Sequence, residues 1–92
     1  MEDRSRGSVL VVDDEPTIAE VVSRYLERAG YRTRVAGDGA QALELVADQR
    51  PDLVVLDLML PGIDGLEVMR RLRQPERDRI GLILLTAKGD ES

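Results

Sequence analysis

Short apolar runs alternate along this chain with segments in which apolar residues recur every three or four positions. The runs at 8–13, 53–58 and 80–86 are continuous rather than alternating, which is typical of strands buried on both faces of a parallel sheet. A more polar run at 32–36 favours a strand at the edge of that sheet. Helical spacing over 15–29, over 40–48 and after residue 65 predicts three helices between the four strands.

Proline and glycine mark the boundaries of the predicted helices. Pro16 suits a first helical turn, Gly30 suits the residue after a helix, and Pro51 stops the second helix. The inward faces are predicted from the spacing, and Tyr25 is expected in the core because it falls on the apolar stripe of the first helix. These faces comprise Ile18, Val21, Val22, Tyr25, Leu26 and Ala29 in the first helix, Ala42, Leu43, Val46 and Ala47 in the second, and Leu66, Met69 and Leu72 in the third.

The regular alternation of strand and helix indicates the fold class. Successive βαβ units form parallel sheets with helices on both faces, so we predict an α/β fold. The flavodoxin-like form of this doubly wound fold would give the strand order 2-1-3-4. At 92 residues the chain has room for one domain, which we place at 8–92, after a polar and loose segment at 1–7.

Composition removes several classes of function. The net charge of −5 and the scattered arginines argue against direct binding of nucleic acid by this segment. The apolar runs are too short to cross a bilayer, and the first residues lack the apolar centre of a signal peptide, so a cytoplasmic location is expected. Because the chain has no cysteine and no histidine, chemistry must come from carboxylates, hydroxyls and the backbone.

Acidic residues follow two of the predicted buried strands. Asp13 and Asp14 end the first strand, Asp57 ends the third, and the hydroxyl of Thr86 ends the fourth. In a doubly wound sheet the carboxyl ends of neighbouring strands converge where the winding reverses, which is where such folds bind ligands. Carboxylates gathered there repel one another and favour a hard cation with oxygen ligands, of which Mg²⁺ is the usual one at sites that handle phosphate.

Three motifs together resemble the receiver domain of bacterial two-component response regulators, in the subfamily that includes transcription factors. They read VLVVDDEP, VVLDLMLPGIDG and LILLTAKG, and the resemblance covers the chain from about Val9 to Glu91. It implies that Asp57 accepts a phosphoryl group from a histidine kinase and that Mg²⁺ assists. The resemblance also implies that the carboxylates of Asp13 and Asp14 hold the ion.

The same resemblance implies three further contacts. The backbone carbonyl of Met59 would bind the ion, the hydroxyl of Thr86 would turn toward the phosphoryl group, and the amide of Ala87 would lie close by. Members of the family continue through a fourth helix, a fifth strand and a fifth helix, and these have no counterpart in the chain. We therefore expect a receiver fold that lacks its final helix, strand and helix.

Without those elements, the fourth strand would be an exposed sheet edge and the first helix would expose apolar surface. Exposed edges and patches invite pairing with another chain, so we predict a homodimer through this uncovered edge, with or without an exchange of elements between the two copies.

Two other functions compete with the receiver interpretation. One is a Mg²⁺-dependent phosphohydrolase with an aspartyl-phosphate intermediate, although Met59 stands where such enzymes usually carry a second acid. The other is an interaction domain that does not switch.

Overall fold

The computed structural model describes residues 6–57, 60, 62, 65–72 and 80–85. Strands and helices alternate through this part of the chain, as the sequence predicts. The elements are β1 (Ser8–Val12), α1 (Pro16–Arg28), β2 (Arg32–Ala36), α2 (Gly39–Asp48), β3 (Leu53–Asp57), α3 (Gly65–Leu72) and β4 (Gly81–Leu85). The predicted α/β class is therefore confirmed.

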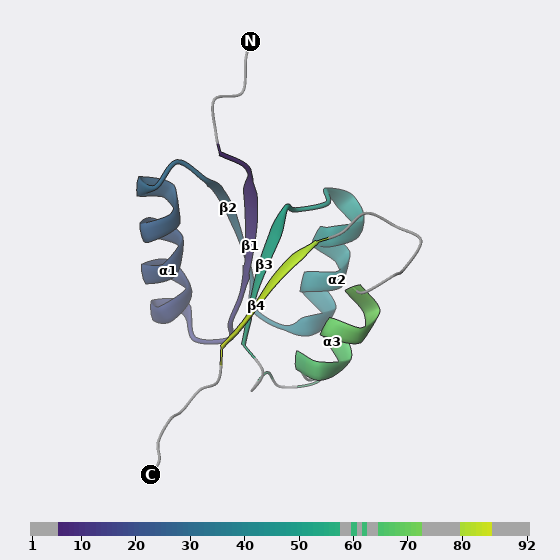
Figure 1. The fold of residues 1–92 in the computed structure, drawn as a ribbon. Helices are drawn as coiled ribbons and strands as arrows, with labels where there is room; N and C mark the ends of the chain where they lie inside the picture. Colours follow the sequence, from purple (N-terminus) through teal and green to yellow (C-terminus); the bar gives the residue numbers. More distant parts are fainter. Residues whose placement is uncertain (1–5, 58–59, 61, 63–64, 73–79, 86–92) are drawn as a thin grey trace.

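The four strands form one parallel sheet in the order β2-β1-β3-β4, which confirms the predicted order (Figure 1). β2 lies at one edge, as its polar sequence indicated. The helices lie in two layers, with α1 on one face of the sheet and α2 and α3 on the other (Figure 1). The direction of winding changes between β1 and β3, so the switch point of the fold lies at the carboxyl ends of these two strands.

Two apolar clusters hold the layers together. The larger one lies between the sheet and the layer of α2 and α3, and the smaller one lies under α1. Among the described residues, the larger cluster has ten buried members, namely Leu10, Val12, Ala36, Ala42, Val46, Val54, Leu56, Leu60, Val68 and Leu72. The smaller has four, namely Val9, Val11, Ala19 and Val55. Because apolar burial is the main stabilising contribution, α1 is the more weakly held layer.

Both ends of α1 follow from local chemistry. Pro16 is the first helical residue, where the missing N–H costs nothing because it would have no partner in the helix. After the last turn Gly30 adopts a φ of 102°, a left-handed conformation that favours glycine. There the N–H of Gly30 donates to the carbonyl of Glu27 and the N–H of Tyr31 donates to that of Leu26, both at 3.0 Å. This Schellman motif confirms Gly30 as the helix stop.

The predicted inward face of α1 is partly wrong. Tyr25 is not in the core, since 71% of its surface is exposed, and Ile18 and Val21 are 47% and 49% exposed. Ala19 and Ser23 are the buried residues of this helix. Val22 and Leu26 are half-buried against the small cluster, as predicted. Helical spacing gives the width of an apolar stripe but not which part of that stripe faces the sheet, and in α1 the inward part is centred on Ala19 and Ser23.

The other two helices show smaller departures from the predicted faces. In α2, Ala42 and Val46 are buried as expected, whereas Ala47 is exposed. In α3, Leu72 is buried and Leu66 is 57% exposed, while Val68 fills the core position instead.

Candidate functional site

Strand register brings the predicted acidic residues together. Val12 of β1 pairs with Leu56 of β3, so the next residues along these parallel strands, Asp13 and Asp57, lie side by side at the switch point. The ladder continues one step past β1, because the N–H of Asp13 donates to the carbonyl of Ala36 at 3.0 Å. Asp57 therefore ends one of the two central strands of the sheet, and Asp13 directly follows the other.

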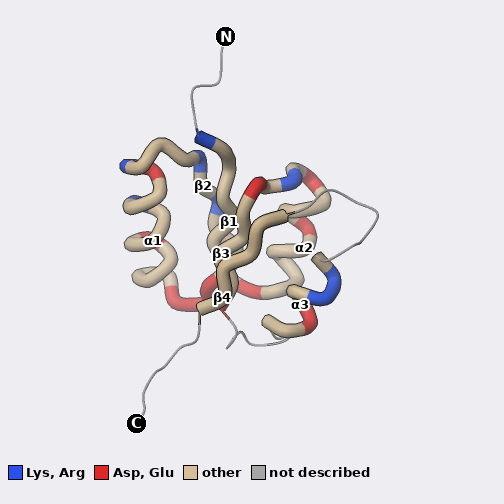
Figure 2. Tube along the Cα trace, in the orientation of Figure 1, with Lys and Arg blue, Asp and Glu red and all other residues tan. Residues whose placement is uncertain are grey.

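Asp14 completes a compact group of three acids. One carboxylate oxygen from each of Asp13, Asp14 and Asp57 lies within 4.8 Å of the others. Asp13 is 6% exposed and Asp57 is 8% exposed, whereas Asp14 is exposed to solvent. Figure 2 shows the acidic residues of the loop that joins β1 to α1, at the carboxyl ends of the strands. The group thus combines two buried ligands with one that reaches the surface.

The electrostatics of Asp13 reflect this crowding. Burial of its carboxylate raises the pKa above the ordinary value of 3.8, and the negative charges of Asp57 and Asp14 raise it further. The N–H of Glu15 donates to Asp13 Oδ1 at 2.9 Å and opposes that rise by stabilising the charged form. Asp13 therefore carries its charge at a cost that a nearby cation would offset.

Sequence reasoning found the three acids but missed the backbone groups that position them. The amide of Glu15 and the carbonyl of Ala36 fix Asp13 in place. An aspartate two residues before the N-cap residue of a helix is the signal that could have predicted the first of these contacts. The other predicted site residues, Met59, Thr86 and Ala87, lie outside the described residues.

The donor set fits a hard divalent cation. Three carboxylate oxygens within 4.8 Å of one another can share one ion, and the chain offers neither a thiolate nor an imidazole as a ligand, since it has no cysteine and no histidine. Mg²⁺ typically takes one or two carboxylates and keeps several waters, which matches a group that is open to solvent at Asp14. The fold and the site define a doubly wound α/β domain with an acidic, oxygen-only site at its switch point.

Comparison with known proteins identifies the family. Residues 9–92 match the response regulator receiver domain, and the chain belongs to that family. The chain is 49% identical over 88 residues to the DNA-binding response regulator MtrA of Mycolicibacterium smegmatis, a match that covers 96% of this chain and 38% of the relative. It is 46% identical over 84 residues to the transcriptional regulatory protein AfsQ1 of Streptomyces coelicolor, covering 91% of this chain and 36% of that one.

Solved structures agree with this assignment. The N-terminal domain of a response regulator receiver protein from Methanoculleus marisnigri superposes with a TM-score of 0.84 at 41% identity, covering 95% of this chain and 72% of that one. The response regulator TrrA from Thermotoga maritima, in complex with Mg²⁺ and BeF, gives a TM-score of 0.81 at 43% identity, covering 88% and 70%. The chain is thus a receiver domain of two-component response regulators, and it spans less than two fifths of the length of the curated relatives it matches.

Among the described residues no helix is long and apolar enough to cross a membrane.

Proposed function

We propose that this receiver domain accepts a phosphoryl group on the carboxylate of Asp57, with a histidine kinase as donor and Mg²⁺ as cofactor. The observation that carries the proposal is the group of three carboxylate oxygens at the switch point of a receiver fold. A cytoplasmic location is part of the same proposal.

Following the family resemblance, we assign separate tasks to the three acids. An oxygen of Asp57 attacks phosphorus in line with the bond to the leaving imidazole, so an O–P bond forms as the P–N bond breaks. Asp57 is the last residue of a buried central strand, which holds its backbone in place beside Asp13. A bound Mg²⁺ would neutralise charge between the carboxylate and the incoming phosphoryl group.

Asp13 and Asp14 would hold that ion, together with the backbone carbonyl of Met59. We assign the hydroxyl of Thr86 and the amide of Ala87 to contact the phosphoryl group once it has been transferred. These two groups are donors, and a phosphoryl group carries about two negative charges and three acceptor oxygens, so the match is chemically sound.

Mass spectrometry of the intact protein tests the proposal. The protein is incubated with acetyl phosphate and Mg²⁺, and we expect the mass to increase by one phosphoryl group. The Asp57→Asn variant should gain nothing. Asp48→Asn is the matched control, because it removes one negative charge from the exposed end of α2, and it should react like the wild type.

The other outcomes are equally informative. Rapid release of free phosphate without a lasting adduct would favour the phosphohydrolase interpretation and contradict the proposal. Equal labelling of the wild type and Asp57→Asn would show that another residue is the acceptor. If the wild type neither gains a phosphoryl group nor binds Mg²⁺, the chain is an interaction domain and the proposal fails.

A further inference from the structure

One peptide unit joins the end of β2 to the acidic site. It comprises the carbonyl of Ala36, the last residue of β2, and the N–H of Gly37, the residue that follows. The carbonyl accepts from the N–H of Asp13 at 3.0 Å. The N–H, which points the opposite way in the same peptide plane, donates to Gln41 Oε1 at 2.8 Å. A side chain of α2 and the backbone of the acidic site are therefore linked through a single rigid unit.

The side chain of Gln41 is itself held in place. Gln41 lies in the first turn of α2, and its N–H donates to Oδ1 of the N-cap residue Asp38 at 2.8 Å. This arrangement resembles a capping box, except that the glutamine side chain reaches the N–H of Gly37, one residue before the N-cap residue. Only the oxygen of a glutamine side chain can accept from an N–H, so the contact also fixes which way the amide group is turned. The turn between β2 and α2 is thus closed by two reciprocal hydrogen bonds.

The contact matters because it lies where the sheet ends. β2 is an edge strand, and the bond between Asp13 and Ala36 is the first one beyond the last residue of β1. A hydrogen bond weakens steeply when its angle departs from linearity, so a rotation of the 36–37 peptide would loosen this bond. A peptide whose N–H is donating is also a better acceptor at its carbonyl. Gln41 therefore both orients and strengthens the acceptor that holds the amide of Asp13.

We infer that Gln41 is a positioning residue for the metal site. It is exposed to solvent and reaches the site through the 36–37 peptide. The amide at the end of this path belongs to Asp13, whose carboxylate is buried. One oxygen of that carboxylate lies within 4.8 Å of oxygens of Asp14 and Asp57, so a small turn of the Asp13 backbone changes the spacing of the three ligands. The inference rests on the proposed function, because it takes Asp13 as a ligand of Mg²⁺.

Amide exchange in the metal-free protein tests the first step, from Gln41 to Asp13. Gln41→Met keeps the length of the side chain and removes the acceptor, so the N–H of Asp13 should exchange about fivefold faster relative to that of Val11, the loss expected for one neutral hydrogen bond. Val11 lies two residues earlier along β1 and reports any general loss of stability. Gln41→Glu keeps an acceptor oxygen and should leave this ratio within about twofold of the wild type. Gln49→Met is the matched control, because Gln49, at the other end of α2, makes its contacts through its backbone.

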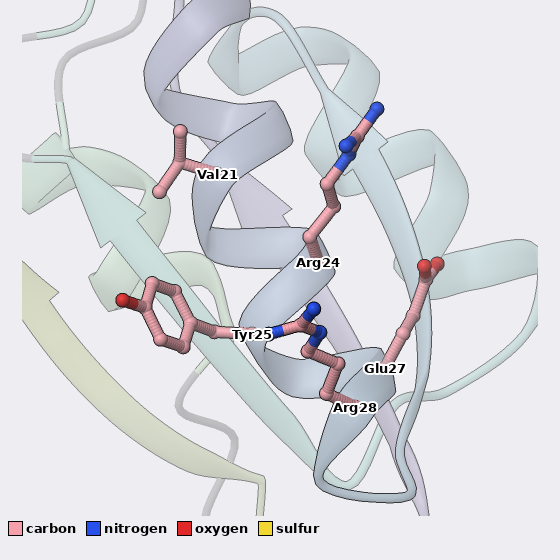
Figure 3. Close-up of a pocket in the computed structure, with 5 residues that line it drawn as sticks. All are labelled: Val21, Arg24, Tyr25, Glu27 and Arg28. Carbon is pink, nitrogen blue, oxygen red and sulfur yellow. The ribbon is translucent and has the colours of Figure 1, made fainter.

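Calorimetric titration with Mg²⁺ tests the second step, from Asp13 to the metal. Gln41→Met should bind Mg²⁺ about tenfold more weakly than the wild type, which is the lower end of the range for residues that orient a metal ligand. Gln41→Glu should bind within about threefold of the wild type, since it restores the acceptor. Its added negative charge is controlled by Arg28→Gln, which also lowers the net charge by one. Arg28 ends α1, at the far end of this helix from the acids, and lines an open hollow of about 550 Å³ with Val21 and Tyr25 (Figure 3).

The failure of this inference and the failure of the proposed function are distinguishable. The inference is overturned if Gln41→Met leaves the exchange ratio of Asp13 to Val11 within about twofold of the wild type, because the side chain then does not hold this amide. It is also overturned if the wild type binds Mg²⁺ and Gln41→Met binds it equally well. A wild type that binds no Mg²⁺ contradicts the proposed function itself, and the inference falls with it.

Discussion

Replacing Asp13 by asparagine should make the metal-free protein more stable while weakening its response to Mg²⁺. Asp13 is almost fully buried, and its carboxylate lies within 4.8 Å of those of Asp57 and Asp14. Asparagine has nearly the same shape, and its side-chain oxygen can still accept from the N–H of Glu15. The substitution therefore removes repulsion and keeps the contact that positions the side chain.

The size of the effect follows from Coulomb's law. Two unit charges 4.8 Å apart repel by about 3.5 kcal/mol at an effective dielectric constant near 20 and by about 1 kcal/mol in bulk water. The repulsion between the buried carboxylates of Asp13 and Asp57 lies between these limits. The repulsion between Asp13 and Asp14 is closer to the lower limit, because Asp14 is exposed to solvent. After the cost of burying an amide, we expect Asp13→Asn to raise the free energy of unfolding by about 1–2 kcal/mol. For a domain of this size that corresponds to roughly 5–15 °C in Tm.

The pH dependence has a definite sign. Because burial and like charges raise the pKa of Asp13, the folded protein keeps that proton to a higher pH than the unfolded chain does. The free energy of unfolding of the wild type therefore falls as the pH rises from the ordinary value of 3.8 through the raised pKa. The advantage of the asparagine variant should be small near pH 4 and should reach its full size at neutral pH.

Thermal unfolding in EDTA and in Mg²⁺, at constant ionic strength, measures both effects. At ten times the dissociation constant, a ligand that binds only the folded state stabilises it by about 1.4 kcal/mol. Mg²⁺ should increase the free energy of unfolding of the wild type by an amount of this order, and it should have much less effect on Asp13→Asn. Asp48→Asn is the control for net charge. If Asp13→Asn in EDTA is no more stable than Asp48→Asn, repulsion among the three acids is not the dominant effect at this site.

Two predictions concern the helices, and both can be measured by urea unfolding. Ser23→Ala should stabilise the protein by about 1 kcal/mol, because Ser23 Oγ is buried without a hydrogen-bond partner; a loss of stability would show that the hydroxyl has a partner in solution. Asp38→Ala should destabilise it by about 1 kcal/mol, because Asp38 Oδ1 caps α2 by accepting from the N–H of Gln41 at 2.8 Å. Asp38→Asn, which keeps the capping oxygen, should be nearly neutral, and a loss equal to that of alanine would contradict the capping role.

The order of elements and the acidic site could both be predicted from sequence. Continuous runs such as SVLVV and LVVLD have one plausible environment, a parallel sheet covered on both faces, and the acids that follow them must then lie at its carboxyl edge. This logic placed Asp13, Asp14 and Asp57 together without any knowledge of distances. The family resemblance supplied the roles of these residues, which the geometry alone does not assign.

The orientation of α1 could not be predicted in the same way. Ile18, Val21 and Tyr25 belong to a broad apolar stripe, and periodicity cannot tell which side of such a stripe faces the sheet. The choice depends on the space above β1 and β2, where Ala19 and Ser23 fit. The contact between the amide of Glu15 and Asp13 was missed because it uses a backbone group, and the only hint of it in the sequence is an aspartate two residues before the N-cap residue of α1.

The thin cluster beneath α1 has a consequence for the acidic site. The cluster under this helix has four buried members, against ten on the other face, so the release of α1 from the sheet should be the least costly opening of the fold, and amide exchange should be fastest there. Asp13 and Asp14 lead directly into α1, and the amide of Glu15 that orients Asp13 is its N-cap residue. Whatever orders α1 therefore also orders two of the three carboxylates, and by linkage a cation held by these carboxylates would slow amide exchange in a helix that it never touches.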